Sequence, residues 1–260
     1  MTWTQSLVIS VREGCVKNFH RASLILGLIG AGTAVGIWFY QHFANPSEQA
    51  AVTHREVATR VLAEYLAAHY PGKAALVMSN PFRQKKGQPK QIYVFEEAGI
   101  RGLRKGFSKP AIFRVVFPEL RAECYQNPQS IYVDPKTTTP LSYLVAENSF
   151  NVLAQQNPDC EIIISLIGLP VGLKQTELWR KSGAPRFALL LPDWRTLGDS
   201  EMVRAAFQSG KLIAAVLNKP GAPPEDARFD ADVRTEFEKR FLLVTVENID
   251  QLRRAYPKLF

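Results

Sequence analysis

Six short apolar runs recur after residue 71, and each is followed by a stretch with the amphipathic pattern of a helix. The runs are Ala74–Met78, Ile112–Phe117, Glu161–Ile167, Phe187–Leu191, Leu212–Leu217 and Phe241–Val246. Runs of this kind are typical of strands buried on both faces, as in parallel sheets. The helical stretches cover roughly 91–106, 140–157, 174–182, 199–208, 230–239 and 248–256. This alternation predicts an α/β fold with a doubly wound, mostly parallel sheet of about six strands.

A second constraint is the uncharged segment Ala22–Tyr40 near the start of the chain. At about 1.5 Å per residue, a helix of this length nearly spans a hydrocarbon core of about 30 Å. Trp38 and Tyr40 stand at its end, where aromatic rings favour the membrane interface. The basic residues Arg12, Lys17 and Arg21 precede it, and no Lys or Arg follows until Arg55. The positive-inside rule therefore predicts a single-pass anchor with its N-terminus in the cytoplasm.

Other interpretations of this segment remain open. A cleaved signal peptide has a shorter apolar core and small residues near its cleavage site, where this chain carries His42. Gly30 with Gly32 and Gly36 imitates a dinucleotide-binding pattern, but that pattern needs a strand before it and a helix after it. Gly32 and Gly36 also form a GxxxG pair that could bring two membrane helices together in a homodimer. Glycine is, however, generally frequent in membrane helices.

The predicted layout is a cytoplasmic tail (1–21), a transmembrane anchor (22–43), a connector with an amphipathic helix (44–72) and an extracytoplasmic α/β domain (73–260). The protein is accordingly placed in the inner or plasma membrane. Residues 44–56 are expected to form a polar connector, followed by a helix that ends at Pro71-Gly72. One stripe of this helix is apolar, with Val57, Val61, Leu62, Tyr65 and Leu66. The other side is polar, with Arg55, Glu56, Thr59, Arg60 and Glu64.

Polar residues follow the predicted strands. In open parallel sheets, ligands bind outside the carboxyl ends of the strands. The candidates at that rim are Ser79, Asn80, Glu119, Asp193, Asn218 and Asn248. Each of these residues also suits an ordinary strand-exit turn. As a set, they mark the edge of the sheet at which a ligand is expected.

Four segments resemble the periplasmic-binding-protein-like family, in particular the substrate-binding components of ABC transporters. They are CEIIISLIGLP at Cys160–Pro170, PRFALLLPD at Pro185–Asp193, GKLIAAVLNKP at Gly210–Pro220 and FLLVTVENIDQL at Phe241–Leu252. The resemblance implies an exported or anchored protein that binds a small solute between two lobes and does no chemistry. The chain is shorter after Pro71 than such two-lobed proteins, so a reduced domain, or one that contacts other proteins, fits its length better.

The formal net charge is +8, and much of the surplus lies in one window. Residues 83–109 contain eight basic residues, Arg83, Lys85, Lys86, Lys90, Arg101, Arg104, Lys105 and Lys109, against Glu96 and Glu97. This basic patch could attract an anionic small molecule, lipid headgroups or an acidic protein partner. It could equally be a solvated surface. Nucleic acid is not expected as a partner, because the domain is placed outside the cytoplasm.

Catalytic patterns are missing from the sequence. It has no G-x-S-x-G, Walker A or H-E-x-x-H motif, and its histidines, His20, His42, His54 and His69, have no metal-ligand spacing. No metal or cofactor is therefore expected. The pairs Glu96-Glu97 and Asp230/Asp232 are interpreted as helix-face and capping groups. The predicted function is a ligand- or solute-binding module without catalytic activity; the alternative is a structural or scaffolding subunit of an envelope complex.

The three cysteines leave one question open. Cys15 is expected in the cytoplasm, whereas Cys124 and Cys160 share the exported side, where disulfides persist. These two could form a disulfide or remain as two buried thiols, depending on whether their Cα atoms lie within about 7 Å.

Overall fold

The computed structural model describes residues 46–107, 113–181 and 185–260. The chain divides into two units, Met1–Gln49 and Ala50–Phe260, and the sheet with its helices belongs to the second. The predicted anchor, the cytoplasmic tail, Cys15 and the Gly32/Gly36 pair lie outside the described residues. No helix in the described ranges is long and apolar enough to cross a membrane.

All six predicted strands form, and they make one sheet in the order β2-β1-β3-β4-β5-β6. The strands are β1 (Ala75–Met78), β2 (Phe113–Val116), β3 (Ile162–Ser165), β4 (Arg186–Leu190), β5 (Leu212–Asn218) and β6 (Phe241–Val244). Every neighbouring pair from β2 to β5 is parallel. The predicted mostly parallel α/β sheet is confirmed.

The last strand runs the other way. β6 pairs antiparallel with β5, with Phe241 opposite Asn218. The helix α9 (Val233–Arg240) ends directly before Phe241, so β6 starts beside the carboxyl end of β5 and returns toward the amino end. Asn248, which follows β6, therefore lies at the opposite edge of the sheet from the other candidates. Its placement at the ligand-binding rim is wrong.

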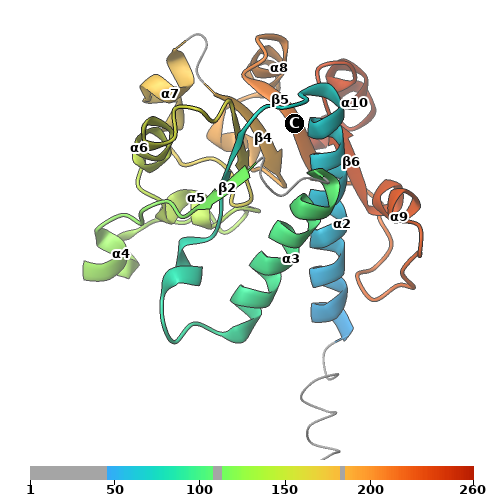
Figure 1. The fold of residues 1–260 in the computed structure, drawn as a ribbon, viewed down its shortest axis with the longest axis horizontal. Helices are drawn as coiled ribbons and strands as arrows, with labels where there is room; N and C mark the ends of the chain where they lie inside the picture. The colour runs from blue at the N-terminus through green and yellow to red at the C-terminus, as the bar shows by residue number, and fades with distance from the viewer. Residues whose placement is uncertain (1–45, 108–112, 182–184) are drawn as a thin grey trace, which may run out of the picture. The chain divides into compact units, whose positions relative to one another are not determined.

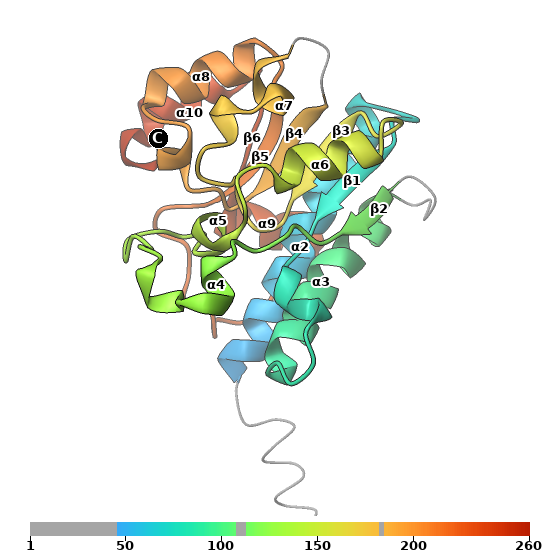
Figure 2. The same ribbon diagram turned by 90° about the vertical axis from the view of Figure 1, so that its left-hand side faces the viewer.

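Helices cover both faces of the sheet (Figures 1 and 2). On one face α2 (Pro46–His69), α3 (Lys90–Phe107) and α9 pack in a cluster that includes Leu62, Val77 and Leu103. On the other face lie α6 (Ser149–Gln156), α8 (Ser200–Gln208) and α10 (Ile249–Ala255), around Leu76, Phe150 and Phe207. Successive residues of a strand point to opposite faces, so the continuous apolar runs supply both clusters.

Two predicted helices are interrupted. The stretch 140–157 contains α5 (Leu141–Leu144) and then α6, because Val145 is extended and forms a bridge with Leu120. The stretch 174–182 contains the short helices η4 (Leu173–Gln175) and α7 (Glu177–Arg180). The segment after β2 adds α4 (Glu123–Gln126), η3 (Pro128–Ser130) and a long irregular loop. The remaining single-turn helices are η1 (Pro81–Gln84), η5 (Trp194–Thr196) and η6 (Pro257–Leu259).

The helix α2 differs from its prediction in two ways. It begins at Pro46, so the described part of the expected connector is helical. Its apolar stripe is confirmed, since Val57, Val61, Leu62 and Leu66 are buried, but Arg55 and Thr59 are buried as well. The reason is that α2 packs against α3 in addition to the sheet, which widens its buried face.

Cys124 and Cys160 are free thiols in this structure. Cys124 donates from its Sγ to the carbonyl oxygen of Leu144 at 3.4 Å. Cys160 is buried directly before β3, where burial raises the pKa of its thiol. Of the two alternatives left open by the sequence, the disulfide between Cys124 and Cys160 is therefore not formed.

Candidate ligand-binding site

The strand order changes direction between β1 and β3, and this is the point where an open α/β sheet most often binds a ligand. Here the crevice at their carboxyl ends is filled by an ion pair between Arg55 of α2 and Glu96 of α3, 2.8 Å apart. The same Arg55 nitrogen, Nη2, donates to the carbonyl oxygen of Leu166 after β3 at 3.2 Å. Ser79 Oγ donates to Glu96 at 2.9 Å, and the Asn80 backbone amide lies 3.3 Å from it.

This group of residues, the switch-point cluster, is closed to solvent. Arg55 is 8% exposed and Glu96 is 3% exposed. Burial lowers the pKa of Arg55, and the charge of Glu96 opposes that shift. The Ser79 hydroxyl donates to Glu96. The Asn80 side chain caps η1 by accepting a hydrogen bond from the Phe82 amide. Both side chains are therefore occupied by partners within the chain. The prediction that Glu96 is a helix-face group is wrong: it is the acceptor that fills the crevice.

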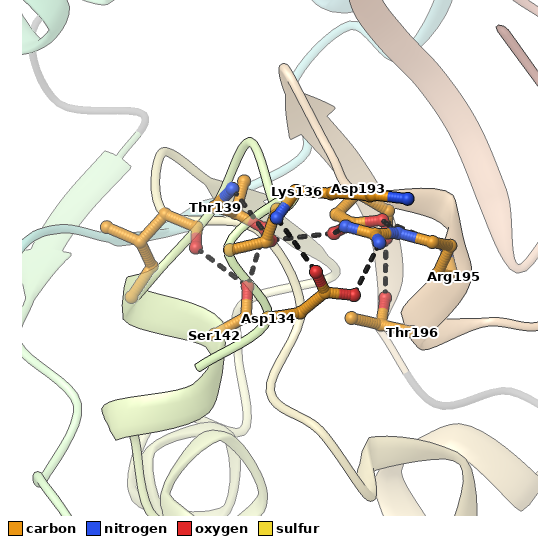
Figure 3. A network of polar contacts seen from close by, with 9 residues as sticks. Asp134, Lys136, Thr139, Ser142, Asp193, Arg195 and Thr196 are labelled. Atoms are coloured by element: carbon orange, nitrogen blue, oxygen red, sulfur yellow. Dashed lines mark hydrogen bonds and ion pairs between the residues drawn. The ribbon is translucent and has the colours of Figure 1, made fainter. Parts of the chain in front are cut away.

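Asp193, after β4, is committed to a second network (Figure 3). It accepts from Arg195 through Nε at 2.9 Å and Nη2 at 2.6 Å, and from Thr137 at 2.6 Å. Arg195 also donates to Asp134 at 2.5 Å. Although burial opposes it, the bonds from Arg195 and Thr137 lower the pKa of Asp193. The carboxylate thus fastens the loop after β2 to the end of β4.

Beside this network, Ser142 Oγ donates to Thr139 Oγ1 at 2.9 Å and lies 3.3 Å from the carbonyl oxygen of Ile167 after β3 (Figure 3). These contacts hold the same loop against the sheet. The polar side chains at this part of the rim therefore bind one another.

The other three candidate residues, Asn218, Glu119 and Asn248, lie apart from these two networks. Asn218 is exposed at the end of β5, in a pocket described next. Glu119 is exposed, and among the described residues no side-chain hydrogen bond or ion pair of it is seen. Asn248 closes the turn after β6, accepting from the Thr245 amide and donating to the carbonyl oxygen of Leu243, each at 2.8 Å.

A pocket of about 280 Å³ opens at the carboxyl ends of β4 and β5. We call it the strand-end pocket. The apolar walls are Phe95 of α3, Leu190 at the end of β4 and Leu191 directly after it. The polar groups come from His54, Arg55, Asn218, Glu225 and Arg240. The pocket therefore combines apolar walls with a few convergent polar groups, as small-molecule sites do.

A buried charge cluster forms one side of this pocket. Arg240 Nε donates to Glu236, and His54 Nε2 lies 3.2 Å from the same carboxylate oxygen. Arg240 Nη1 also donates to the carbonyl oxygens of Pro223 and Pro224, each at 3.0 Å, which fixes the loop that carries Glu225. Burial and the charge of Arg240 lower the pKa of His54. One donor of this cluster, Arg240 Nη2, is buried without a hydrogen-bond acceptor.

The backbone of the pocket is strained at one position. Leu191 has a φ of 47°, and among the described residues it is the one non-glycine residue with a positive φ. A side-chain-bearing residue in this region costs about 1–3 kcal/mol and is found mainly at binding and active sites. The Leu191 amide donates to the carbonyl oxygen of Val216 at 2.8 Å, which holds this conformation.

The predicted basic patch is largely paired. Arg83 and Arg104 bind Glu97 at 2.6 and 2.9 Å, and Arg101 and Lys105 bind Glu56 at 2.6 and 2.5 Å. Lys85 lies 3.8 Å from the ring centre of Tyr125. Lys86 and Lys90 are exposed, and Lys109 falls outside the described residues. The sequence count missed Glu56, which precedes the window but reaches it from α2.

Similar proteins are found only among solved structures. No protein-family model matches the chain, and no curated protein matches it. It is similar to GanP, a glucose-galactose binding protein from Geobacillus stearothermophilus, at 12% identity and a TM-score of 0.38, over 77% of this chain and 54% of that one. It is also similar to an ABC transporter solute binding protein from Mycobacterium smegmatis with bound glycerol, at 14% identity and a TM-score of 0.44, over 77% and 61%.

A third similar structure is an ABC transporter periplasmic solute binding protein from Actinobacillus succinogenes with bound D-allose, at 13% identity and a TM-score of 0.44, over 76% and 61%. The chain thus spans about 54–61% of the length of these three structures. The resemblance predicted from the sequence is found again among solved structures. At such identities it says nothing about the ligand, which has to be inferred from the residues of the site.

Proposed function

We propose that this protein is a membrane-anchored, extracytoplasmic module that binds a small ligand in the strand-end pocket and does no chemistry. The observation that carries the proposal is the pocket itself: a concave space at the carboxyl ends of two parallel strands, with apolar walls, polar groups and a strained backbone at Leu191. This is the edge at which α/β sheets bind ligands.

The chemistry of the pocket favours a small ligand with hydrogen-bond acceptors, such as a carboxylate. Its volume of about 280 Å³ is just below the usual range for ligand pockets, about 300–1,000 Å³, so the ligand is expected to be small. Arg240 Nη2 is a buried donor that lacks an acceptor, and a buried unpaired donor costs about 1–3 kcal/mol. A ligand oxygen that reached this donor would recover part of that cost.

Filling the pocket tests this proposal. Ala222 lines the pocket from the loop after β5, and Ala227 lies on the same loop without lining it. We expect Ala222→Trp to abolish ligand binding and Ala227→Trp to leave it unchanged. Native mass spectrometry of the full chain, extracted from its source membrane in mild detergent, shows the bound ligand as an added mass.

The expected result is an added mass on the wild type and on Ala227→Trp, and none on Ala222→Trp. Equal binding by all three chains would place the ligand elsewhere. A wild-type chain that carries no added mass, and gains none from a mixture of small carboxylic acids and sugars, contradicts the binding function.

Membrane anchoring is a separate part of the proposal. It is supported by the uncharged run Ala22–Tyr40 and by the basic residues that stand only before it. We expect protease added to intact spheroplasts to digest the region 46–260, and the same protease added to intact cells to leave it whole. A chain that stays protected in spheroplasts and is digested only after lysis refutes the proposed orientation.

A second candidate function is a structural or scaffolding subunit of an envelope complex. One observation favours it: the crevice between β1 and β3, the usual ligand site, is filled by the buried pair Arg55 and Glu96. A scaffold needs no open crevice there. The pocket variants separate the two functions, because Ala222→Trp impairs a ligand-binding module and leaves a scaffold intact.

A further inference from the structure

A wide groove lies at the amino ends of β4 and β5, the edge of the sheet opposite the strand-end pocket. Its volume is about 710 Å³, and it is lined by five cationic side chains, Lys174, Arg180, Lys181, Arg186 and Lys211. We call it the basic groove. Arg186 is the first residue of β4, and Lys211 directly precedes β5. No aspartate or glutamate is among the residues that line it.

Within the described residues, none of these five cations forms an ion pair with a carboxylate. Lys174 Nζ donates to the carbonyl oxygen of Leu197 at 2.8 Å, and Arg180 Nε donates to that of Lys174 at 3.2 Å. Lys211 Nζ donates to the carbonyl oxygens of Leu178 and Lys181, at 3.1 and 3.2 Å. Backbone oxygens thus orient Lys174, Arg180 and Lys211 but do not neutralise their charges.

The basic groove differs from the predicted basic patch in having no carboxylates beside its cations. There, Glu56 and Glu97 each bind two cations. In the groove, like charges gather without a counter-charge, which raises the electrostatic potential of the site and attracts anions. Burial lowers the pKa of Lys211, the most enclosed of the five, as expected for a cation with no carboxylate beside it.

The groove also offers apolar surface. Trp179 and Leu197 contribute to its lining, and Met202 is 51% exposed beside them. A simple inorganic anion would use the cations and leave this surface open. An extended peptide could use both, placing carboxylates on the cations and an apolar side chain against Trp179 and Met202. Interfaces typically combine an apolar centre with a polar rim.

We infer that the basic groove docks an acidic segment of a partner protein, rich in aspartate and glutamate and carrying at least one large apolar residue. This inference does not depend on the proposed ligand in the strand-end pocket, because the two sites lie at opposite edges of the sheet. The partner would make contact on the far side of the domain from the ligand.

The test uses the full chain in a neutral detergent and a set of short fluorescent acidic peptides that carry one Leu, Phe or Trp at varied positions. The groove variant is Lys174→Gln/Arg180→Gln/Lys181→Gln/Arg186→Gln. The matched control, Arg83→Gln/Lys85→Gln/Lys86→Gln/Lys90→Gln, removes the same formal charge from the predicted basic patch. Fluorescence anisotropy gives Kd for each at two salt concentrations.

We expect the groove variant to raise Kd at least about tenfold and the control to change it less than about threefold, because charge at the contact site governs association more than net charge does. Wild-type binding should weaken with salt, since the Debye length is about 8 Å at physiological ionic strength. Peptides with Asn and Gln in place of the acids should not bind.

Three results overturn the inference. One is that no acidic peptide binds. Another is that the groove variant and the control lose peptide binding equally, because the peptide would then be attracted by the net charge of the protein and not by the groove. The third is that vesicles containing phosphatidylglycerol bind the groove better than any peptide does, which assigns the groove to lipid headgroups. A melting temperature unchanged in both variants excludes unfolding as the cause of any loss.

Discussion

Substitution of Glu96 by alanine is expected to lower the free energy of unfolding by about 3–5 kcal/mol, the usual effect of removing one partner from a buried ion pair. Glu96 accepts from Arg55, Ser79 and the Asn80 amide. Its loss leaves the Arg55 guanidinium, 8% exposed, without its counter-charge. Urea unfolding of the full chain, followed by circular dichroism, gives the change as a lower midpoint at constant slope.

The adjacent residue is the matched control. Glu97 lies on the same helix and binds two arginines, but it is 36% exposed. Replacing it with alanine should change the free energy of unfolding by less than about 1 kcal/mol, because exposed ion pairs contribute little. If Glu97→Ala costs as much as Glu96→Ala, burial of the pair is not the cause.

A double variant shows whether the charges of the pair or the volume that its side chains fill determines the stability. Arg55→Met with Glu96→Leu removes both charges and keeps similar volume. Such replacements of a buried pair are often neutral or stabilising. We therefore expect the double variant to recover most of the loss seen for Glu96→Ala. If it is less stable than the single variant, the hydrogen bonds to Ser79 and Leu166 matter more than the charges.

The sheet could be predicted because its strands are short, continuous apolar runs. Residues such as Val77 and Leu76 pack on opposite faces of the same strand, so both faces of the sheet are apolar and the runs stand out. The direction of β6 could not be predicted in this way. It depends on α9 ending at Arg240, beside the carboxyl end of β5, and no periodicity in Phe241–Val244 encodes it.

The switch-point cluster was missed for a different reason. Because Arg55 and Thr59 are polar, the sequence predicts that they face solvent. Yet Arg55, Ala58, Thr59, Leu62 and Leu66 follow one another at helical spacing, and all of them are buried. Glu96 precedes Ile100, Leu103 and Phe107 in the same way. Charged residues that continue an apolar stripe in two separate helices are the signal that could have indicated a buried pair.

Of the candidate rim residues, only Asn218 lines the strand-end pocket. Ser79 and Asp193 also lie at the carboxyl ends of their strands, but they bind partners of their own chain. Sequence position identifies the edge of a parallel sheet. It does not show which part of that edge the loops fill, because the filling residues, such as Thr137 and Arg195, come from segments without a periodic pattern.

The second large effect is expected at Gly102, where α3 packs closely against α2. A Cβ atom added to Gly102 would lie 2.1 Å from Thr59 Oγ1 and 2.3 Å from the backbone oxygen of Glu56. We expect Gly102→Ala to lower the free energy of unfolding by about 3 kcal/mol, at the upper end of the usual cost of overpacking. This loss should appear even though alanine is the better helix former by about 1 kcal/mol.

Two further variants show whether the backbone contact is the cause. At Gly99 the added Cβ would lie 3.1 Å from Nε of Arg55 and 3.4 Å from Leu166 Cδ1, both side-chain atoms that can shift. Gly99→Ala should therefore cost clearly less than Gly102→Ala in the same urea unfolding measurement. Thr59→Ala removes the nearer contact at Gly102 but leaves the Glu56 carbonyl at 2.3 Å, a position that the α2 backbone fixes. It should not restore the stability of Gly102→Ala, and full restoration would mean that the Thr59 side chain, and not the approach of the two helices, requires glycine at this position.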